Sequence, residues 1–130
     1  MTDKKLILIV EDEMVLAKTM EERFKDEGFE VVLAHNGLDG FQTAINLHPD
    51  IILLDLLMPV LDGVSMLGKL REDKWGSTVK VMILSNLSDP KSLLTGADKE
   101  MKYVSNYFVK TDLSLDELIV KINTELNIKI

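Results

Sequence analysis

The feature that most constrains this chain is the apolar run Ile51-Ile52-Leu53-Leu54, which ends in the carboxylate of Asp55. The run lies between Pro49 and Pro59 and is too short for a helix, so it predicts a strand buried on both faces. Strands of this kind occur in parallel sheets that helices cover on both sides. The pattern therefore predicts a strand over residues 51–55, with Asp55 at its exposed tip.

Two further apolar runs end in polar side chains in the same way. The run from Leu6 to Val10 is followed by Glu11-Asp12-Glu13, and the run from Val79 to Leu84 is followed by Ser85. In a sheet of parallel strands the carboxyl ends lie at the same edge, where such sheets bind their ligands. The three runs therefore indicate one shared site.

The rest of the chain alternates between strand and helix patterns. Apolar side chains at helical spacing predict helices over residues 13–27, 37–48, 63–73 and 115–126, and a helix that begins at Asp89 and Pro90. The last helix has the clearest start, because Ser114 and Glu117 form an S-x-x-E capping box. Two more strands are predicted over residues 29–34 and 107–109.

Five strand–helix units predict an α/β fold, with a doubly wound five-stranded parallel sheet in the order 2-1-3-4-5, the flavodoxin-like (βα)5 arrangement. The strand order reverses between strands one and three, which end in Glu11-Asp12 and in Asp55. A chain of 130 residues, 46% of them hydrophobic, suits one compact core. We therefore expect a single domain over residues 1–130.

The expected carboxylate cluster points to a divalent cation. Glu11, Asp12 and Asp55 would repel one another unless a cation neutralised them. Oxygen ligands suit Mg²⁺ better than zinc, and the chain has no cysteine. Strand five would bring Lys110 to the same edge, beside Ser85. Such a site can hold a phosphoryl group, with Asp55 as ligand or nucleophile.

Charge and composition restrict the partners and the compartment. The formal net charge of -7 argues against direct nucleic-acid binding and against binding to anionic membranes. The apolar residues before Glu11 are too few for a signal peptide or a membrane span. The absence of cysteine is compatible with a reducing compartment. We expect a cytoplasmic domain that is a monomer or a weak dimer.

In order and spacing, these motifs resemble the receiver domain of two-component response regulators, in particular the single-domain chemotaxis type. The resemblance covers essentially all 130 residues. The motifs that carry it are Val10-Glu11-Asp12-Glu13, Leu53-Leu54-Asp55-Leu56-Leu57-Met58-Pro59 with Asp62-Gly63, Ile83-Leu84-Ser85, and Tyr107-Phe108-Val109-Lys110.

The resemblance implies a phosphorelay receiver. Asp55 would accept the phosphoryl group from a sensor histidine kinase, a phosphotransfer protein or a small phosphodonor. Mg²⁺ would be bound by Asp55, by Asp12 directly, by Glu11 mainly through water, and by the backbone carbonyl of Leu57. The chain would be no enzyme beyond catalysing its own phosphorylation and dephosphorylation.

The resemblance also implies how the signal leaves the site. Lys110 would pair with the phosphoryl oxygens, and Ser85 would donate a hydrogen bond to one of them. Tyr107 would act as the aromatic switch that moves inward, which changes the face of helix four, strand five and helix five for a downstream protein target. Two departures from the family pattern, Asn86 after the serine and Thr111 after the lysine, predict a different phosphate lifetime and a different Lys110 loop.

Three other functions share parts of this sequence pattern. An FMN-binding module is disfavoured because Glu-Asp-Glu after strand one would repel the cofactor's phosphate. An aspartyl-phosphate phosphohydrolase is disfavoured because position 57 is leucine and not a second acid. A degenerate receiver that serves as a phosphorylation-independent docking module remains the alternative.

Overall fold

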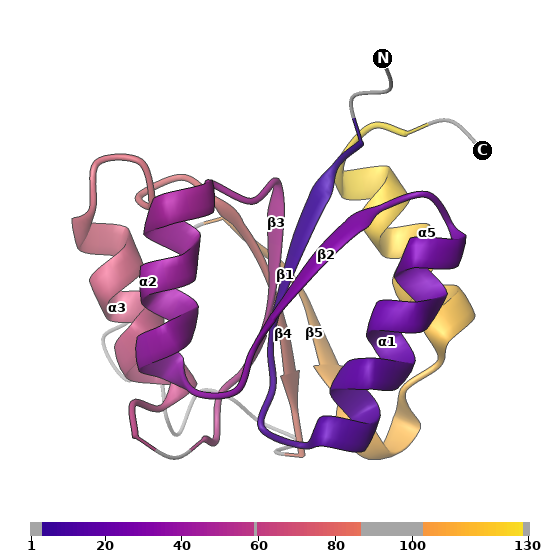
Figure 1. Ribbon diagram of the computed structural model, residues 1–130, viewed down its shortest axis with the longest axis horizontal. Helices are drawn as coiled ribbons and strands as arrows, with labels where there is room; N and C mark the ends of the chain where they lie inside the picture. The colour runs from indigo at the N-terminus through magenta and orange to yellow at the C-terminus, as the bar shows by residue number, and fades with distance from the viewer. Residues whose placement is uncertain (1–3, 59, 87–102, 129–130) are drawn as a thin grey trace.

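The computed structural model describes residues 4–58, 60–86 and 103–128 (Figure 1). Every pair of neighbouring strands is parallel, and the sheet order is β2-β1-β3-β4-β5. This confirms the predicted doubly wound sheet and its order. The strands are β1 (Leu6–Val10), β2 (Glu30–Ala34), β3 (Ile51–Asp55), β4 (Lys80–Ser85) and β5 (Val104–Val109).

In the described part of the chain, helices cover both faces of the sheet. The helices α2 (Gly37–Leu47) and α3 (Gly63–Glu72) lie on one face, and α1 (Met14–Asp26) and α5 (Leu115–Glu125) lie on the other (Figure 1). The helix predicted from Asp89 falls outside the described residues.

The alternation of side chains along each strand explains the two cores. Successive side chains of a strand point to opposite faces of the sheet. Ile51 and Leu53 of β3 pack with Met20 and Phe24 of α1 and with α5. The intervening residues Ile52 and Leu54 pack with α2 and α3, and all of β3 is buried. The apolar run of β3 therefore serves both cores at once.

Several predicted helix ends are confirmed. Gly28 follows the last turn of α1 with a φ of 97°, a conformation that glycine adopts without the steric cost of a side chain. The hydroxyl of Ser114 accepts a hydrogen bond from the backbone N–H of Glu117 at 3.3 Å, which is the expected start of α5.

Several boundaries differ from the prediction, most of them by one residue. The strand β5 begins at Val104 and not at Tyr107, because Val104 and Asn106 pair with Val81 and Met82 of β4, while Ser105 lies between them at a shift in the register. The helix α1 begins at Met14, and Glu13 is its N-cap residue with an extended backbone. None of these changes moves a strand to another place in the sheet.

Candidate functional site

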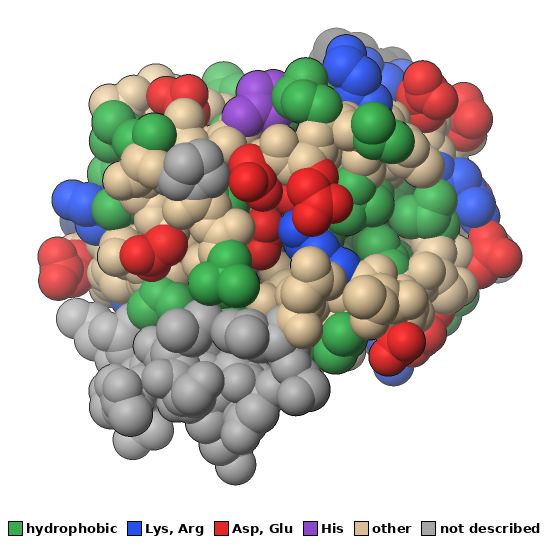
Figure 2. Space-filling model, turned by 90° about the horizontal axis from the view of Figure 1, so that it is seen from below, with side chains coloured by type: hydrophobic (Ala, Val, Ile, Leu, Met, Phe, Trp, Pro, Cys, Tyr) green, Lys and Arg blue, Asp and Glu red, His purple; other side chains and the backbone are tan. Residues whose placement is uncertain are grey.

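Charged side chains converge where the carboxyl ends of three strands meet. Glu11 follows β1, Asp55 ends β3 and Lys110 follows β5 as the first residue of the short 3-10 helix η2 (Lys110–Asp112). Figure 2 views the molecule from this end and shows acidic side chains gathered around a basic one. The parallel topology thus brings together residues that are far apart in the sequence.

The predicted acidic cluster is present. One ligand atom each from Glu11, Asp12 and Asp55 lies within 4.8 Å of the others. Glu11 and Asp55 are buried, at 0% and 2% exposure, whereas Asp12 is exposed. The cluster therefore has two carboxylates embedded in the protein and a third that faces solvent.

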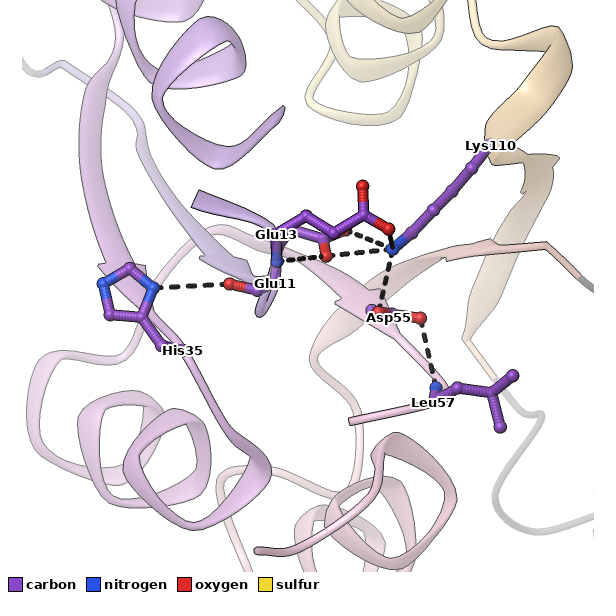
Figure 3. A network of polar contacts seen from close by, with 6 residues as sticks. All are labelled: Glu11, Glu13, His35, Asp55, Leu57 and Lys110. Atoms are coloured by element: carbon purple, nitrogen blue, oxygen red, sulfur yellow. Dashed lines mark hydrogen bonds and ion pairs between the residues drawn. The ribbon is translucent and has the colours of Figure 1, made fainter. Parts of the chain in front are cut away.

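Lys110 lies at the centre of the site (Figure 3). Its Nζ donates hydrogen bonds to Glu11 Oε2 and Asp55 Oδ2 at 2.9 Å each, and to Glu13 Oε1 at 3.2 Å. The lysine side chain is 7% exposed. An ammonium group has three protons to donate, so all of them are directed at carboxylates.

Backbone groups orient the two buried carboxylates. Asp55 Oδ1 accepts the N–H of Leu57 at 3.1 Å, and Glu11 Oε2 accepts the N–H of Glu13 at 3.0 Å. Glu11 Oε1 lies 2.9 Å from the Lys110 ammonium, yet no described donor is aligned for a hydrogen bond to it. This oxygen keeps a lone-pair direction available to a cation.

Burial controls the protonation of these groups. It raises the pKa of Glu11 to about 7, although hydrogen bonds from Lys110 and from the Glu13 backbone oppose the shift. Burial also raises the pKa of Asp55, again opposed by Lys110 and by the Leu57 backbone. For Lys110, burial alone would lower the pKa, but its hydrogen bonds to Glu11 and Asp55 outweigh this and raise it. The site therefore favours a positive charge between its carboxylates.

The start of α3 packs directly on the end of β3. A Cβ atom at Gly63 would lie 2.1 Å from the carbonyl oxygen of Asp55 and 2.6 Å from Cα of Leu56. The Gly63 N–H donates to the Leu56 carbonyl at 3.0 Å, and Asp62 caps the helix by accepting the N–H of Ser65 at 2.7 Å. Only glycine fits this approach, which supports the backbone beside Asp55.

The two predicted switch residues lie on the neighbouring strands. Ser85 is buried at the end of β4, one residue beyond the position that pairs with Asp55. Tyr107 is half-buried on β5 opposite Ile83 and packs against the core that faces α2 and α3. Their placement is as expected, and their roles stay predictions.

Two contacts of the site were missed by sequence reasoning. Glu13 was interpreted as a first-turn helix acid, but it precedes α1 and its carboxylate contacts Lys110. His35 is exposed, and its Nδ1 lies 3.3 Å from the backbone oxygen of Glu11. The uninterrupted run Glu11-Asp12-Glu13 was the signal that a further acid lies at the site.

A doubly wound sheet with an acidic cluster and a lysine at its reversal point is the arrangement of a signal receiver domain. Residues 7–123 match the response regulator receiver domain family, and the chain belongs to that family. In the described part of the chain, no helix has both the length and the apolar character that crossing a bilayer requires.

Known relatives and structures agree with this assignment. The chain is 34% identical over 92 residues to the probable transcriptional regulator ycf29 of Pyropia yezoensis, which covers 71% of this chain and 41% of the relative. The Francisella response regulator 1452 receiver domain is 25% identical with a TM-score of 0.81, covering 95% of this chain and 98% of that one.

The response regulator protein TrrA of Thermotoga maritima, solved in complex with Mg(2+)-BeF, is 28% identical with a TM-score of 0.77. That match covers 93% of this chain and 98% of that one. The chain spans about half or less of the length of the curated relatives it matches, between 41% and 52%.

Proposed function

We propose that this chain is a phosphorylation-dependent switch in which Asp55 accepts a phosphoryl group from a sensor histidine kinase or a phosphotransfer protein. The observation that carries the proposal is the convergence of Glu11, Asp12 and Asp55 with the buried ammonium of Lys110. A carboxylate beside a cationic side chain can act as the nucleophile towards a phosphoryl group once a metal ion neutralises the neighbouring carboxylates.

The residues present fit a magnesium ion. All the side-chain donors are oxygens within 4.8 Å of one another, and Glu11 Oε1 has no aligned hydrogen-bond donor among the described residues. Glu11, Asp12, Asp55 and the backbone carbonyl of Leu57 would hold the ion. When bound, Mg²⁺ would neutralise the carboxylates and polarise the phosphoryl oxygens. The magnesium complex of Thermotoga TrrA supports this cofactor.

The transfer needs little from the protein beyond position and charge. In the reaction with acetyl phosphate, an oxygen of the Asp55 carboxylate forms a bond to phosphorus while the bond from phosphorus to the acetyl oxygen breaks. Acetate leaves with the electron pair, and no proton moves. Lys110 compensates the charge of the phosphoryl oxygens, and Ser85 donates a hydrogen bond to one of them.

The phosphoryl group would then alter a surface for a downstream protein target. It adds roughly two negative charges at one point. Ser85 lies on the strand next to Asp55, and Tyr107 lies one strand further. A shift of Ser85 towards the phosphate with an inward movement of Tyr107 would change the face that β5 and α5 present. The chain would catalyse only its own phosphorylation and dephosphorylation.

Phosphorylation by acetyl phosphate in the presence of Mg²⁺ tests the proposal. Intact-mass measurement should show the gain of one phosphoryl group by the wild type and none by Asp55→Asn, because the variant lacks the nucleophilic oxygen. Asp26→Asn removes an exposed acid of α1 and should be labelled like the wild type. Labelling of Asp55→Asn would overturn the assignment of the acceptor. An unlabelled wild type would favour the phosphorylation-independent docking module.

A further inference from the structure

All the protons of the Lys110 ammonium group already have acceptors. Its three ammonium protons are directed at Glu11, Asp55 and Glu13, at 2.9, 2.9 and 3.2 Å. An incoming phosphoryl oxygen needs one of these protons. Until Asp55 itself reacts and loses its charge, one of the three carboxylates must therefore release the lysine when a phosphodonor arrives.

Burial indicates which carboxylate does so. The side chains of Glu11 and Asp55 are 0% and 3% exposed, whereas that of Glu13 is 54% exposed. A buried carboxylate that loses the lysine cannot turn to water instead, so its release is costly unless a metal ion takes the place of the lysine. Water can replace the lysine at an exposed carboxylate at little cost. Glu13 is the partner that exchanges most easily, and it also makes the longest of the three contacts.

The side chain of Glu13 is directed at the lysine and not at its own helix. Glu13 is the N-cap residue of α1, but its side chain makes no capping hydrogen bond. The N-cap residues of α2, α3 and α5 all accept one from their own helix. The Glu13 carboxylate points instead at Lys110, 97 residues away in the sequence (Figure 3). The lysine thus has Glu13 as a third partner, and the start of α1 has no side-chain cap.

We propose that Glu13 is a positioning residue whose carboxylate holds the third ammonium proton of Lys110 until a phosphoryl oxygen displaces that carboxylate. This proposal rests on the proposed function. Glu13 thereby competes with the phosphoryl group for Lys110 in the unphosphorylated protein. The carboxylate sets how readily small anionic phosphodonors react with Asp55. It takes no part in bond making or breaking.

The rate of phosphorylation by acetyl phosphate with saturating Mg²⁺ measures this competition. Glu13→Gln keeps the shape of the side chain but removes its charge, so the rate constant should rise roughly two- to fivefold, the size expected of an exposed ion pair. Glu22→Gln makes the same charge change at an exposed position of α1 and should react like the wild type. An equal increase in both variants would reveal a general charge effect and overturn the proposal.

A double-mutant cycle shows whether Glu13 acts through Lys110. In a Lys110→Ala background, where phosphorylation is slow but measurable at high donor concentration, Glu13→Gln should leave the rate unchanged. The same rate increase in both backgrounds would contradict a role through the lysine.

A magnesium titration of the metal-free protein separates Glu13 from the expected ligands. Glu13→Gln should bind Mg²⁺ at least as tightly as the wild type, whereas Asp12→Asn should bind it more weakly. A loss of Mg²⁺ affinity in Glu13→Gln as large as that in Asp12→Asn would make Glu13 a ligand and overturn the proposal.

A wild type that acetyl phosphate does not label would overturn the proposed function and this inference together. A labelled wild type with an unchanged Glu13→Gln rate would overturn this inference alone.

Discussion

At the scale of single residues, the site depends on one lysine that neutralises two buried carboxylates. Lys110 Nζ lies 2.9 Å from both Glu11 and Asp55, and all three side chains are nearly inaccessible to water. Two carboxylates in such surroundings repel each other and lack hydration. The lysine thus compensates the charge of both carboxylates in the metal-free protein.

We therefore expect Lys110→Ala to destabilise the metal-free protein by about 3 kcal/mol, the cost typical of leaving a buried ion pair without one partner. Mg²⁺ should restore more stability to this variant than to the wild type, because the ion and the ammonium neutralise the same carboxylates. Urea unfolding with and without Mg²⁺ measures both effects. Lys121→Ala, which removes an exposed lysine of α5, is the control. Equal stabilities of the two variants would contradict this role of Lys110.

At the scale of secondary-structure elements, the junction of β3 and α3 fixes the position of Asp55. The helix begins so close to the strand end that a side chain at Gly63 would meet backbone atoms of Asp55 and Leu56. Backbone atoms cannot move aside as a flexible side chain can. If a residue with a Cβ replaces this glycine, either the helix α3 or the end of β3 must therefore shift.

Two glycines of the same helix make a matched test. Gly63→Ala should lower the free energy of unfolding by roughly 1–3 kcal/mol through overpacking, and slow the phosphorylation of Asp55. Gly68→Ala should instead raise the free energy of unfolding by about 0.5–1 kcal/mol, because no atom lies within 4 Å of the added methyl group and alanine favours the helix. Urea denaturation gives both values. A Gly63→Ala variant as stable as the wild type would show that the backbone at the junction of β3 and α3 moves at little cost.

At the scale of the whole molecule, the proposed switch requires a local change at Asp55 to reach a surface that another protein can bind. The sheet offers a short route, because Leu84 pairs with Asp55, Ser85 with Val109, and Ile83 with Tyr107. These strands are parallel neighbours, so a displacement at the end of β4 directly alters the contacts of β4 with β5. A population shift of a few kcal/mol is enough to change which surface a partner meets.

The route through Ser85 predicts an uncoupling variant. Beryllofluoride with Mg²⁺, as a mimic of the phosphoryl group, should change the amide hydrogen exchange of β5 in the wild type. In Ser85→Ala it should change exchange around Asp55 but much less in β5, because the hydroxyl that follows the phosphate is missing. An equal response of β5 in both proteins would show that the signal does not pass through Ser85.

Local patterns were sufficient to predict the sheet, its order and the edge at which the site lies. Runs such as Ile51 to Leu54 identify buried strands because burial on both faces leaves no alternation. Polar residues after those runs identify the binding edge, since all strands are parallel. Glu11, Asp12, Asp55 and Lys110 were placed together by this reasoning alone, and the structure brings them together.

The tertiary structure decided what depends on side-chain direction and on packing between distant segments. Arg71 looks like a surface residue of a helix, yet it is 2% exposed and donates to the carbonyls of Gly76 and Val79 at 2.8 and 2.9 Å. The contact of Glu13 with Lys110 spans 97 residues, and no local pattern distinguishes it from a helix cap. Which elements form and where polar groups gather could be predicted from the sequence, because both depend on periodicity. Only the folded chain decided which carboxylates share the lysine, because that depends on how β1, β3 and β5 end relative to one another.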